Sequence, residues 1–279
     1  MQEKIEKLNS INALLKMRAN LLKPINSRYI LGIRIAGTSY EDSINSVLAW
    51  AISGECRYVC TANVHMVMEA FDSEDFREII NKADIVTPDG MPLVLLLRIL
   101  GLNRQKRVYG PTLMKHICKA SAQEDISVGF YGGTPETLKA LVRNLTDQIP
   151  NLKISYAYSP PFRPLTIEED EALVKEINSS GTQILFIGLG CPKQERWMFA
   201  HRDRVKAVMV GVGAGFDFFA GTKKQAPKWM MRIGIEWLFR LFTEPKRLWR
   251  RYLYNNPRFL CLAAMQLLNL RDFEGDFEK

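Results

Sequence analysis

The sequence predicts an α/β protein, with a mostly parallel β-sheet covered by helices and a helical, basic appendage near the C-terminal end. Between residues 29 and 212, short apolar runs typical of buried strands alternate with amphipathic stretches long enough for helices. After Gly221 no strand pattern follows, and positive charge becomes concentrated. A chain of 279 residues, 47% hydrophobic and 24% charged, is typical of a globular domain with an appendage.

The first predicted element is an amphipathic helix within residues 1–25. Ile5, Leu8, Ile11 and Leu15 recur at helical spacing, with basic residues between them. We interpret this segment as a packing or dimerisation helix, so a homo-oligomer is possible, and a membrane contact is the alternative. Its mixed charge and lack of an apolar stretch indicate that it is not a secretory leader.

Seven apolar runs predict the strands of a core domain over residues 26–222. They span 29–35, 58–62, 84–87, 127–131, 153–157, 183–189 and 207–212. Helices are predicted between most of them, as in 40–53, 135–148 and 167–180. Thr166 and Glu169 form a capping-box pattern at the start of one helix. A proline near a predicted helix start is found at Pro111, Pro135 and Pro192.

The third predicted region, residues 223–279, is the appendage, with helices over about 226–242, 245–254 and 257–270. From Lys223 to Arg258 it carries ten Lys and Arg residues against two acids, a net charge of +8 that equals the charge of the whole chain. Seven aromatic residues are interleaved with these cations. A basic and aromatic segment suits a surface with anionic headgroups above an apolar layer.

We therefore expect peripheral association with the cytoplasmic face of the cell membrane. No apolar stretch approaches the roughly 20 residues that would span a bilayer. The five cysteines are scattered and odd in number, which indicates reduced thiols in the cytosol. A tail that binds nucleic acid by stacking and phosphate contacts is the alternative of a different class, and we expect no nucleic-acid partner because the tail contains no recognised module.

Two loops after predicted strands carry short polar side chains. Thr61 and Asn63 come after Tyr58–Cys60 of one predicted strand, and both can donate hydrogen bonds, although Asn63 could simply cap the next helix. Asp89 follows another strand, with Pro88 before it and Gly90 after it. This arrangement could present one carboxylate as a general base. The alternative is that Asp89 is the N-cap of the next helix.

Three glycine-rich loops could bind an anion through backbone N–H groups. The first contains Tyr131 and Gly132. The second contains Gly188, Gly190, Lys193 and Gln194, where a lysine meets a helix start. Each could equally be an ordinary strand-to-helix turn.

The third glycine-rich loop, from Gly211 to Asp217, includes Gly213. It nearly matches a dinucleotide fingerprint, but Phe216 stands where the third glycine belongs, so nicotinamide binding is disfavoured. The sequence has no Asp-x-Asp pair and no P-loop, and its three histidines lack ligand spacing. We therefore expect no metal and no other cofactor.

Taken together, these motifs resemble the WecG/TagA/CpsF glycosyltransferases (glycosyltransferase family 26), and the resemblance covers about residues 30–258. The matching segments are Thr61-Ala-Asn, Thr87-Pro-Asp-Gly, Arg107-Val-Tyr-Gly, Phe130-Tyr-Gly-Gly, Gly188-Leu-Gly-Cys-Pro-Lys-Gln-Glu and Gly211-Val-Gly-Ala-Gly-Phe-Asp-Phe. One departure is Ala62, where family members often have proline.

The resemblance implies a Rossmann-like core and an inverting, metal-independent transfer from a UDP-sugar donor to a polyprenyl-diphosphate-linked sugar in cell-surface polysaccharide synthesis. N-acetylmannosamine is the expected sugar and a GlcNAc-type lipid the expected acceptor. UDP-glucose and UDP-N-acetylmannosaminuronic acid are alternative donors. A catalytically inactive membrane scaffold is a further alternative, which the intact loops disfavour.

The resemblance also implies roles for individual residues. Asp89 is expected to be the general base, with Thr61 and Gln194 orienting the sugars. Asn63 and Arg107 fall at pocket positions, and Asp217 with the glycines before it resembles the donor-side loop. Three appendage arginines match positions that reach the acceptor's diphosphate. They are Arg240, Arg247 and Arg250.

Overall fold

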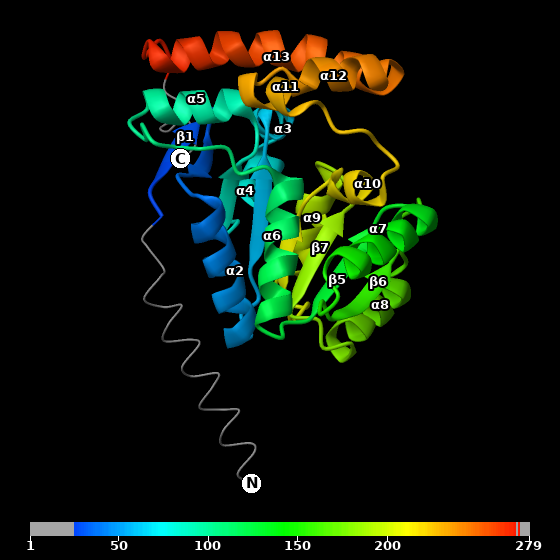
Figure 1. Cartoon of the computed structure of the whole chain (residues 1–279). Coiled ribbons are helices and arrows are strands. Elements are labelled where there is room, and N and C mark those ends of the chain that lie inside the picture. Colours follow the sequence, from blue (N-terminus) through cyan, green and yellow to red (C-terminus); the bar gives the residue numbers. More distant parts are fainter. Residues whose placement is uncertain (1–24, 272, 274–279) are drawn as a thin grey trace. The chain divides into compact units, whose positions relative to one another are not determined.

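The structure is a computed structural model that describes residues 25–271 and residue 273 (Figure 1). The helix predicted within residues 1–25 lies outside the described residues, apart from Ile25. The division into a core over 26–222 and an appendage over 223–279 stays a prediction.

The centre of the fold is a six-stranded sheet with the strand order β4-β3-β8-β7-β5-β6. Its strands are β3 (Tyr58–Ala62), β4 (Ile85–Pro88), β5 (Val128–Gly132), β6 (Ile154–Tyr158), β7 (Ile184–Gly188) and β8 (Val208–Gly211). The pairs β3/β8, β8/β7, β7/β5 and β5/β6 are all parallel. The α/β fold class with a Rossmann-like, mostly parallel sheet is therefore confirmed.

The described chain forms two compact units. The first unit comprises residues Tyr40–Val59 and Gly110–Thr222, and the second comprises Ile25–Ser39, Cys60–Tyr109 and the residues from Lys223 onward. The basic C-terminal helices thus belong to the same unit as the loop that carries Asp89. Strand β3 begins in the first unit and ends in the second.

The first unit packs helices around strands β5 to β8. The helices are α2 (Tyr40–Ser53), α6 (Gly110–Gln123), α7 (Pro135–Gln148), α8 (Ile167–Ser179), α9 (Lys193–His201) and α10 (Gly215–Ala220). Its core contains Phe130 stacked on Phe186, with ring centroids 5.5 Å apart, and Phe216 packs edge-on against Phe130. Thr166 and Glu169 form the predicted capping box of α8.

The second unit begins with a hairpin of β1 (Ser27–Ile30) and β2 (Ile33–Ala36), which pair antiparallel. The prediction of one strand over 29–35 is therefore wrong. Leu31 and Gly32 both have positive φ, as the two central residues of a tight hairpin turn require. Because Leu31 is apolar and fully buried, the apolar pattern runs through the turn and hides it.

The second unit also contains all helices that follow residue 222. Its helices are α3 (Val64–Asp72), α4 (Glu74–Asn81), α5 (Met91–Ile99), α11 (Lys228–Ile233), α12 (Glu236–Thr243) and α13 (Pro245–Leu267). The predicted helix over 226–242 is two helices, because Gly234 adopts a left-handed conformation that ends α11. In Figure 1 the three C-terminal helices are coloured orange to red.

The two helices predicted over 245–254 and 257–270 form one helix, α13, which continues through Pro257. A proline removes one helical hydrogen bond, but packing can outweigh that loss. Here Phe259 and Ala263 are buried, and Arg258 forms an ion pair with Asp72 of α3. Within the described residues, no helix combines the length and the apolar character that crossing a membrane requires.

Candidate functional site

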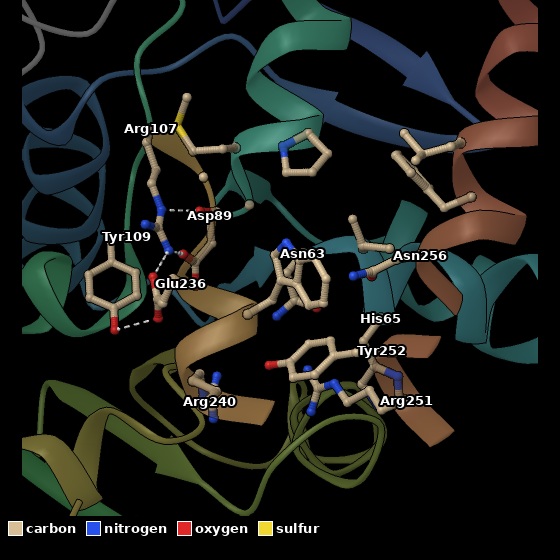
Figure 2. Close-up of a pocket in the computed structure, with 18 residues that line it drawn as sticks. Asn63, His65, Asp89, Arg107, Tyr109, Glu236, Arg240, Arg251, Tyr252 and Asn256 are labelled. Atoms are coloured by element: carbon tan, nitrogen blue, oxygen red, sulfur yellow. Dashed lines mark hydrogen bonds and ion pairs between the residues drawn. The ribbon is translucent and has the colours of Figure 1, made fainter. Parts of the chain in front are cut away.

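A pocket of about 210 Å³ lies entirely within the second unit (Figure 2). That volume far exceeds the roughly 10–15 Å³ that one trapped water needs, so the pocket can admit part of a ligand. It is lined by Asn63, Val64, His65, Asp89, Gly90, Met91, Pro92, Arg107, Tyr109, Gly234, Glu236, Trp237, Arg240, Arg251, Tyr252, Asn256, Phe259 and Leu260. Four of the residues selected from the sequence therefore share one pocket: Asn63, Asp89, Arg107 and Arg240.

Asp89 is held at the carboxyl end of β4 by its main chain. The N–H groups of Asp89 and Gly90 both donate to the carbonyl of Ala62, at 2.8 and 3.1 Å. Gly90 allows this close approach, because a Cβ added there would lie 3.3 Å from the Cα of Asn63. The N-cap of α5 is Gly90, so the alternative prediction that Asp89 caps this helix is wrong.

Asn63 performs the capping role that was its alternative interpretation. Its Oδ1 accepts a hydrogen bond from the N–H of Met66 at 3.3 Å, in the first turn of α3. The residue also lines the pocket, so a structural role and a position at the site coincide.

Arg107 links the two carboxylates of the pocket. Its Nη2 donates to Asp89 Oδ1 at 3.1 Å and to Glu236 Oε2 at 2.8 Å, and its Nε donates to the main-chain carbonyl of Asp89. The side chains of Arg107 and Asp89 are only 17% and 14% exposed. Figure 2 shows the guanidinium lying between the two acids. Burial opposes its charge, but Asp89 and Glu236 outweigh burial and raise the pKa of Arg107, so it stays charged.

Glu236 is a site residue that was not selected from the sequence. It begins α12, where the helix dipole favours a negative charge, and its side chain is 11% exposed. Its Oε1 accepts a hydrogen bond from the hydroxyl of Tyr109 at 3.2 Å. The signal that could have found it is its rarity, because only Glu236 and Glu244 are acidic in the segment with ten cations.

Tyr109 and Arg240 complete this end of the pocket. The guanidinium of Arg107 lies over the ring of Tyr109, 4.3 Å from its centroid. Burial, followed by the charge of Glu236, raises the pKa of Tyr109, so its hydroxyl stays protonated and donates. Burial also opposes the charge of Arg240, but Tyr252 and Glu236 outweigh it and raise its pKa. Two permanent cations therefore accompany two acids here.

His65, which was not selected from the sequence, lies on another wall of the pocket. Its Nδ1 is 3.4 Å from Nδ2 of Asn255 in α13 and 3.5 Å from Oε1 of Glu69, which lies in α3 like His65 itself. Arg251, Tyr252 and Asn256 of α13 line the same pocket and are labelled with His65 in Figure 2. This wall joins α3 to α13 within the second unit.

Three further selected residues of the second unit do not line the pocket. Thr61 is buried in β3. Arg247 is exposed and pairs with Glu244, with 2.6 Å between nitrogen and oxygen. Arg250 is exposed, and its guanidinium lies 5.2 Å from the ring centroid of Trp249.

The first unit places Gln194 in a buried cluster at the start of α9. Its Oε1 accepts from the N–H of Gly213 at 3.1 Å, and its Nε2 donates to Glu195 Oε1 at 2.7 Å. A Cβ added to Gly211 would lie 3.0 Å from Nε2 of Gln194. Gln194 therefore fixes the glycine-rich loop after β8. In this arrangement the N–H of Gly213 already donates to the side-chain amide of Gln194.

Gly132 and Gly188 lie side by side at the ends of β5 and β7. Gly132 has φ of 124°, and a Cβ added there would lie 2.6 Å from the carbonyl carbon of Gly188. A Cβ at Gly188 would lie 2.5 Å from the ring of Phe216. Close packing is therefore a sufficient reason for glycine at both positions. Gly190, in contrast, has nothing within 4 Å of an added Cβ.

The other selected residues of the first unit differ in exposure. Tyr131 is buried, and its ring lies 4.6 Å from Trp197 and 6.2 Å from Tyr158, measured between centroids. Lys193 is exposed at the first position of α9. Asp217 is in the first turn of α10, where its Oδ1 lies 3.4 Å from the hydroxyl of Thr222.

The chemistry available in the pocket is that of a carboxylate beside a fixed cation. Asp89 can accept a proton and hold a hydroxyl in place, while Arg107 and Arg240 can attract an anionic ligand. Among the described residues, no group of three His, Cys, Asp or Glu side chains is arranged to hold a metal ion.

Comparisons with known proteins agree on one family. The model of the glycosyl transferase WecG/TagA/CpsF family matches residues 28–273. The chain is similar to a Bacillus subtilis (strain 168) protein named N-acetylglucosaminyldiphosphoundecaprenol N-acetyl-beta-D-mannosaminyltransferase. The two are 28% identical over 222 residues, which covers 79% of this chain and 84% of the relative.

A relative of the same name from Staphylococcus aureus (strain NCTC 8325) is 30% identical over 238 residues, covering 84% of this chain and 91% of the relative. Another, from Bacillus spizizenii (strain W23), is 29% identical over 197 residues, covering 70% and 74%. The similarity therefore extends over most of each protein.

Proposed function

Because the chain belongs to the WecG/TagA/CpsF family of glycosyltransferases, we propose that it transfers N-acetylmannosamine from a UDP-sugar to the GlcNAc of a polyprenyl-diphosphate lipid. The names of the relatives, which specify an N-acetylmannosaminyl group and a diphosphoundecaprenol-linked acceptor, support this choice of sugar and acceptor. The observation that carries the proposal is the carboxylate of Asp89 at the end of β4, in a pocket that is also lined by three arginines, Arg107, Arg240 and Arg251.

In the proposed reaction, Asp89 accepts the proton of the acceptor hydroxyl. The hydroxyl oxygen then forms a bond to the anomeric carbon from the face opposite UDP, and the bond from that carbon to the diphosphate oxygen breaks. The configuration of the anomeric carbon is inverted, and UDP leaves with the electron pair of the broken bond. The guanidinium of Arg107 donates to both the carboxylate and the main-chain carbonyl of Asp89. These two contacts fix the direction from which the carboxylate accepts the proton.

We propose that the loops of the first unit bind the UDP-sugar. Gly190 leaves space for a ligand to approach the backbone, and Lys193 adds an exposed cation at a helix start. Gln194 would orient the donor loop through Gly213, with Asp217 on the same loop. Departing UDP would be stabilised by Lys193 and by main-chain N–H groups of these strand-to-helix loops, without a metal ion.

We propose that the helices after residue 222 bind the acceptor lipid at the membrane. Arg240 already lines the pocket, and it would contact the acceptor's diphosphate. Arg247 and Arg250 are exposed on α13 and would act on the same diphosphate or on anionic headgroups. The names of the relatives specify a lipid-linked acceptor, which supports a membrane surface, and we propose that this surface is the cytoplasmic face.

The experiment that tests this function measures UDP release and product formation from UDP-N-acetylmannosamine and polyprenyl-diphosphate-GlcNAc in EDTA. The Asp89→Asn variant keeps the side-chain shape but removes the base, so we expect its rate to fall by about 10²–10⁴. Asp75→Asn is the matched control, because Asp75 is exposed in α4 and does not line the pocket.

A near-normal rate for Asp89→Asn would remove Asp89 as the base. Activity of the wild type only after addition of a divalent ion would contradict metal independence. If the wild type does not use UDP-N-acetylmannosamine, a panel with UDP-glucose and UDP-N-acetylmannosaminuronic acid would show whether the choice of sugar is wrong.

A further inference from the structure

Two carboxylates in the pocket share one guanidinium nitrogen. Nη2 of Arg107 is 3.1 Å from Asp89 and 2.8 Å from Glu236, so the shorter contact is to Glu236. Asp89 follows β4, whereas Glu236 begins α12, far along the chain but in the same unit. The proposed base is therefore not the sole partner of the cation beside it.

We propose that Glu236 is a positioning residue for the transfer reaction, which keeps Asp89 basic by drawing the charge of Arg107 toward itself. This inference rests on the proposed function, in which Asp89 accepts the proton of the acceptor hydroxyl. Glu236 itself contacts neither the reacting hydroxyl nor the proton in this scheme. It acts only through Arg107 and through its own negative charge.

The physical reason is the effect of neighbouring charges on a carboxyl group. An arginine beside a single aspartate lowers the pKa of that aspartate by about 1–3, which makes it a weaker base. A second carboxylate on the same arginine opposes this effect, because its negative charge disfavours ionisation of the first. The low exposure of all three side chains strengthens both interactions.

The geometry holds Glu236 in this role from two sides. The hydroxyl of Tyr109 donates to Oε1, which leaves Oε2 directed to Arg107. The ring of Tyr109 also supports the guanidinium of Arg107. Because the raised pKa of Tyr109 keeps its hydroxyl protonated, this donor is present throughout the working pH range. Figure 2 shows the chain of contacts from Tyr109 through Glu236 and Arg107 to Asp89.

Other titratable and charged groups face the same pocket and must be separated in the test. Arg240 comes from α12, Arg251 and Tyr252 come from α13, and His65 comes from α3. The guanidinium groups keep their charge, because arginine is effectively always protonated in proteins. An imidazole ordinarily titrates near pH 6.5, so a His65→Asn variant identifies any part of the pH profile that belongs to the histidine.

The test is the pH profile of kcat/KM for the lipid acceptor, with wild type and Glu236→Gln compared at saturating donor. In Glu236→Gln the negative charge at residue 236 is lost, so Asp89 becomes the only carboxylate paired with Arg107. The pKa of Asp89 should therefore fall. We expect the acidic limb of the profile to move to lower pH. The plateau rate should fall by about threefold to tenfold, because a weaker base accepts the proton less readily.

Glu244→Gln is the matched control. Glu244 is the other acid of the basic segment, but it pairs with Arg247 and Lys223 and does not line the pocket. It should leave the acidic limb where it is in the wild type. If Glu236→Gln fails to fold, Glu236→Ala removes the same charge and gives the same comparison.

An unchanged or upward-shifted limb in the Glu236 variants would overturn the inference, and so would an equal shift in Glu244→Gln. Asp89→Asn separates this failure from failure of the proposed function. If Asp89→Asn is inactive while the Glu236 variants match the wild type, only the role of Glu236 is wrong. If Asp89→Asn is active, the base is wrong and the role of Glu236 falls with it.

Discussion

At Arg107, one side chain satisfies acceptors from two distant parts of the sequence. It contacts the side chain and main chain of Asp89, 18 residues away, and the side chain of Glu236, 129 residues away. The neighbouring N–H of Val108 donates to the carbonyl of Pro88 at 3.0 Å, which holds the segment against the end of β4. The backbone therefore directs the guanidinium into the pocket.

Replacing Arg107 by lysine would change the shape of the cation beside Asp89 while keeping its charge. In Arg107→Lys the charge remains, but one ammonium group cannot reproduce the contacts of Nε and Nη2. We expect steady-state kinetics to show a fall in kcat/KM of about tenfold or more. Thermal unfolding should show only a small decrease in stability. Arg98→Lys is the control, because the Nε of Arg98 bonds the carbonyl of Gln105 outside the pocket. Full activity in Arg107→Lys would show that charge alone suffices.

Of the two acids in the pocket, Asp89 could be selected from the sequence and Glu236 was not. Asp89 could be selected because a carboxylate between Pro88 and Gly90 after an apolar run is an unusual local pattern. Glu236 was not selected, because a glutamate at a helix start is common and its partner is far along the chain. Its rarity as an acid in the basic segment was its one signal in the sequence. Long-range pairing of this kind leaves no local pattern. The catalytic roles themselves stay predictions.

At the scale of elements, two helix starts in the chain are capped in the same way, and one of the caps is a residue selected from the sequence. Asn63 caps α3 and Thr134 caps α7, each by accepting a hydrogen bond from an N–H in the first turn. Only Asn63 lies in the pocket. The pair therefore allows the cost of losing a cap to be separated from the cost of disturbing the site.

The prediction at this scale compares the two caps. Asn63→Ala and Thr134→Ala should each lower the free energy of unfolding by about 0.5–2 kcal/mol, because a first-turn N–H loses its acceptor. Urea denaturation would measure that loss. Transfer activity at a temperature where both variants are folded should fall only for Asn63→Ala. Equal activity of the two variants would show that Asn63 is a cap and nothing more, and Asn63→Asp should restore stability.

Elements were predictable where local patterns decide them. The parallel strands and helices such as α7 and α8 follow from apolar runs, prolines and a capping box. The β1–β2 hairpin was missed because its turn contains a buried leucine in place of the usual Asn-Gly. The continuity of α13 through Pro257 was missed because burial of Phe259 and the Arg258–Asp72 pair override the proline, and both are tertiary effects.

At the scale of the whole molecule, charge is distributed unevenly. The segment from Lys223 to Arg258 carries the net charge of the entire chain, and several large apolar side chains are exposed within it. Those exposed side chains include Trp229, Ile233, Phe242, Trp249 and Leu253. The alternation and the change of pattern at Gly221 predicted the fold class. They could not predict that the segment groups with residues 60–109, because that depends on packing.

The prediction at this scale is salt-sensitive binding to anionic vesicles. Cosedimentation with phosphatidylglycerol vesicles should exceed that with phosphatidylcholine vesicles and weaken between about 0.05 and 0.5 M NaCl, because salt screens exposed charges. The double variant Arg247→Gln/Arg250→Gln should bind about tenfold to thirtyfold more weakly, at about 1 kcal/mol for each cation.

The matched control removes two exposed arginines of the first unit, as Arg163→Gln/Arg204→Gln. It lowers the net charge of the chain by the same amount. If both double variants lose the same affinity, net charge and not the basic segment governs binding. If salt and lipid charge have no effect, the attraction is not electrostatic.

The contact of Gln266 with the β1–β2 hairpin has a consequence for self-association. The amide of Gln266 in α13 donates to the carbonyl of Tyr29 at 2.8 Å and accepts from the N–H of Leu31 at 3.0 Å. A carbonyl and an N–H two residues apart are the groups through which an incoming strand would extend a sheet. The side chain of Gln266 in α13 thus occupies the groups to which a strand of a second copy would pair at this edge, and we expect a chain shortened before Gln266 to aggregate more readily.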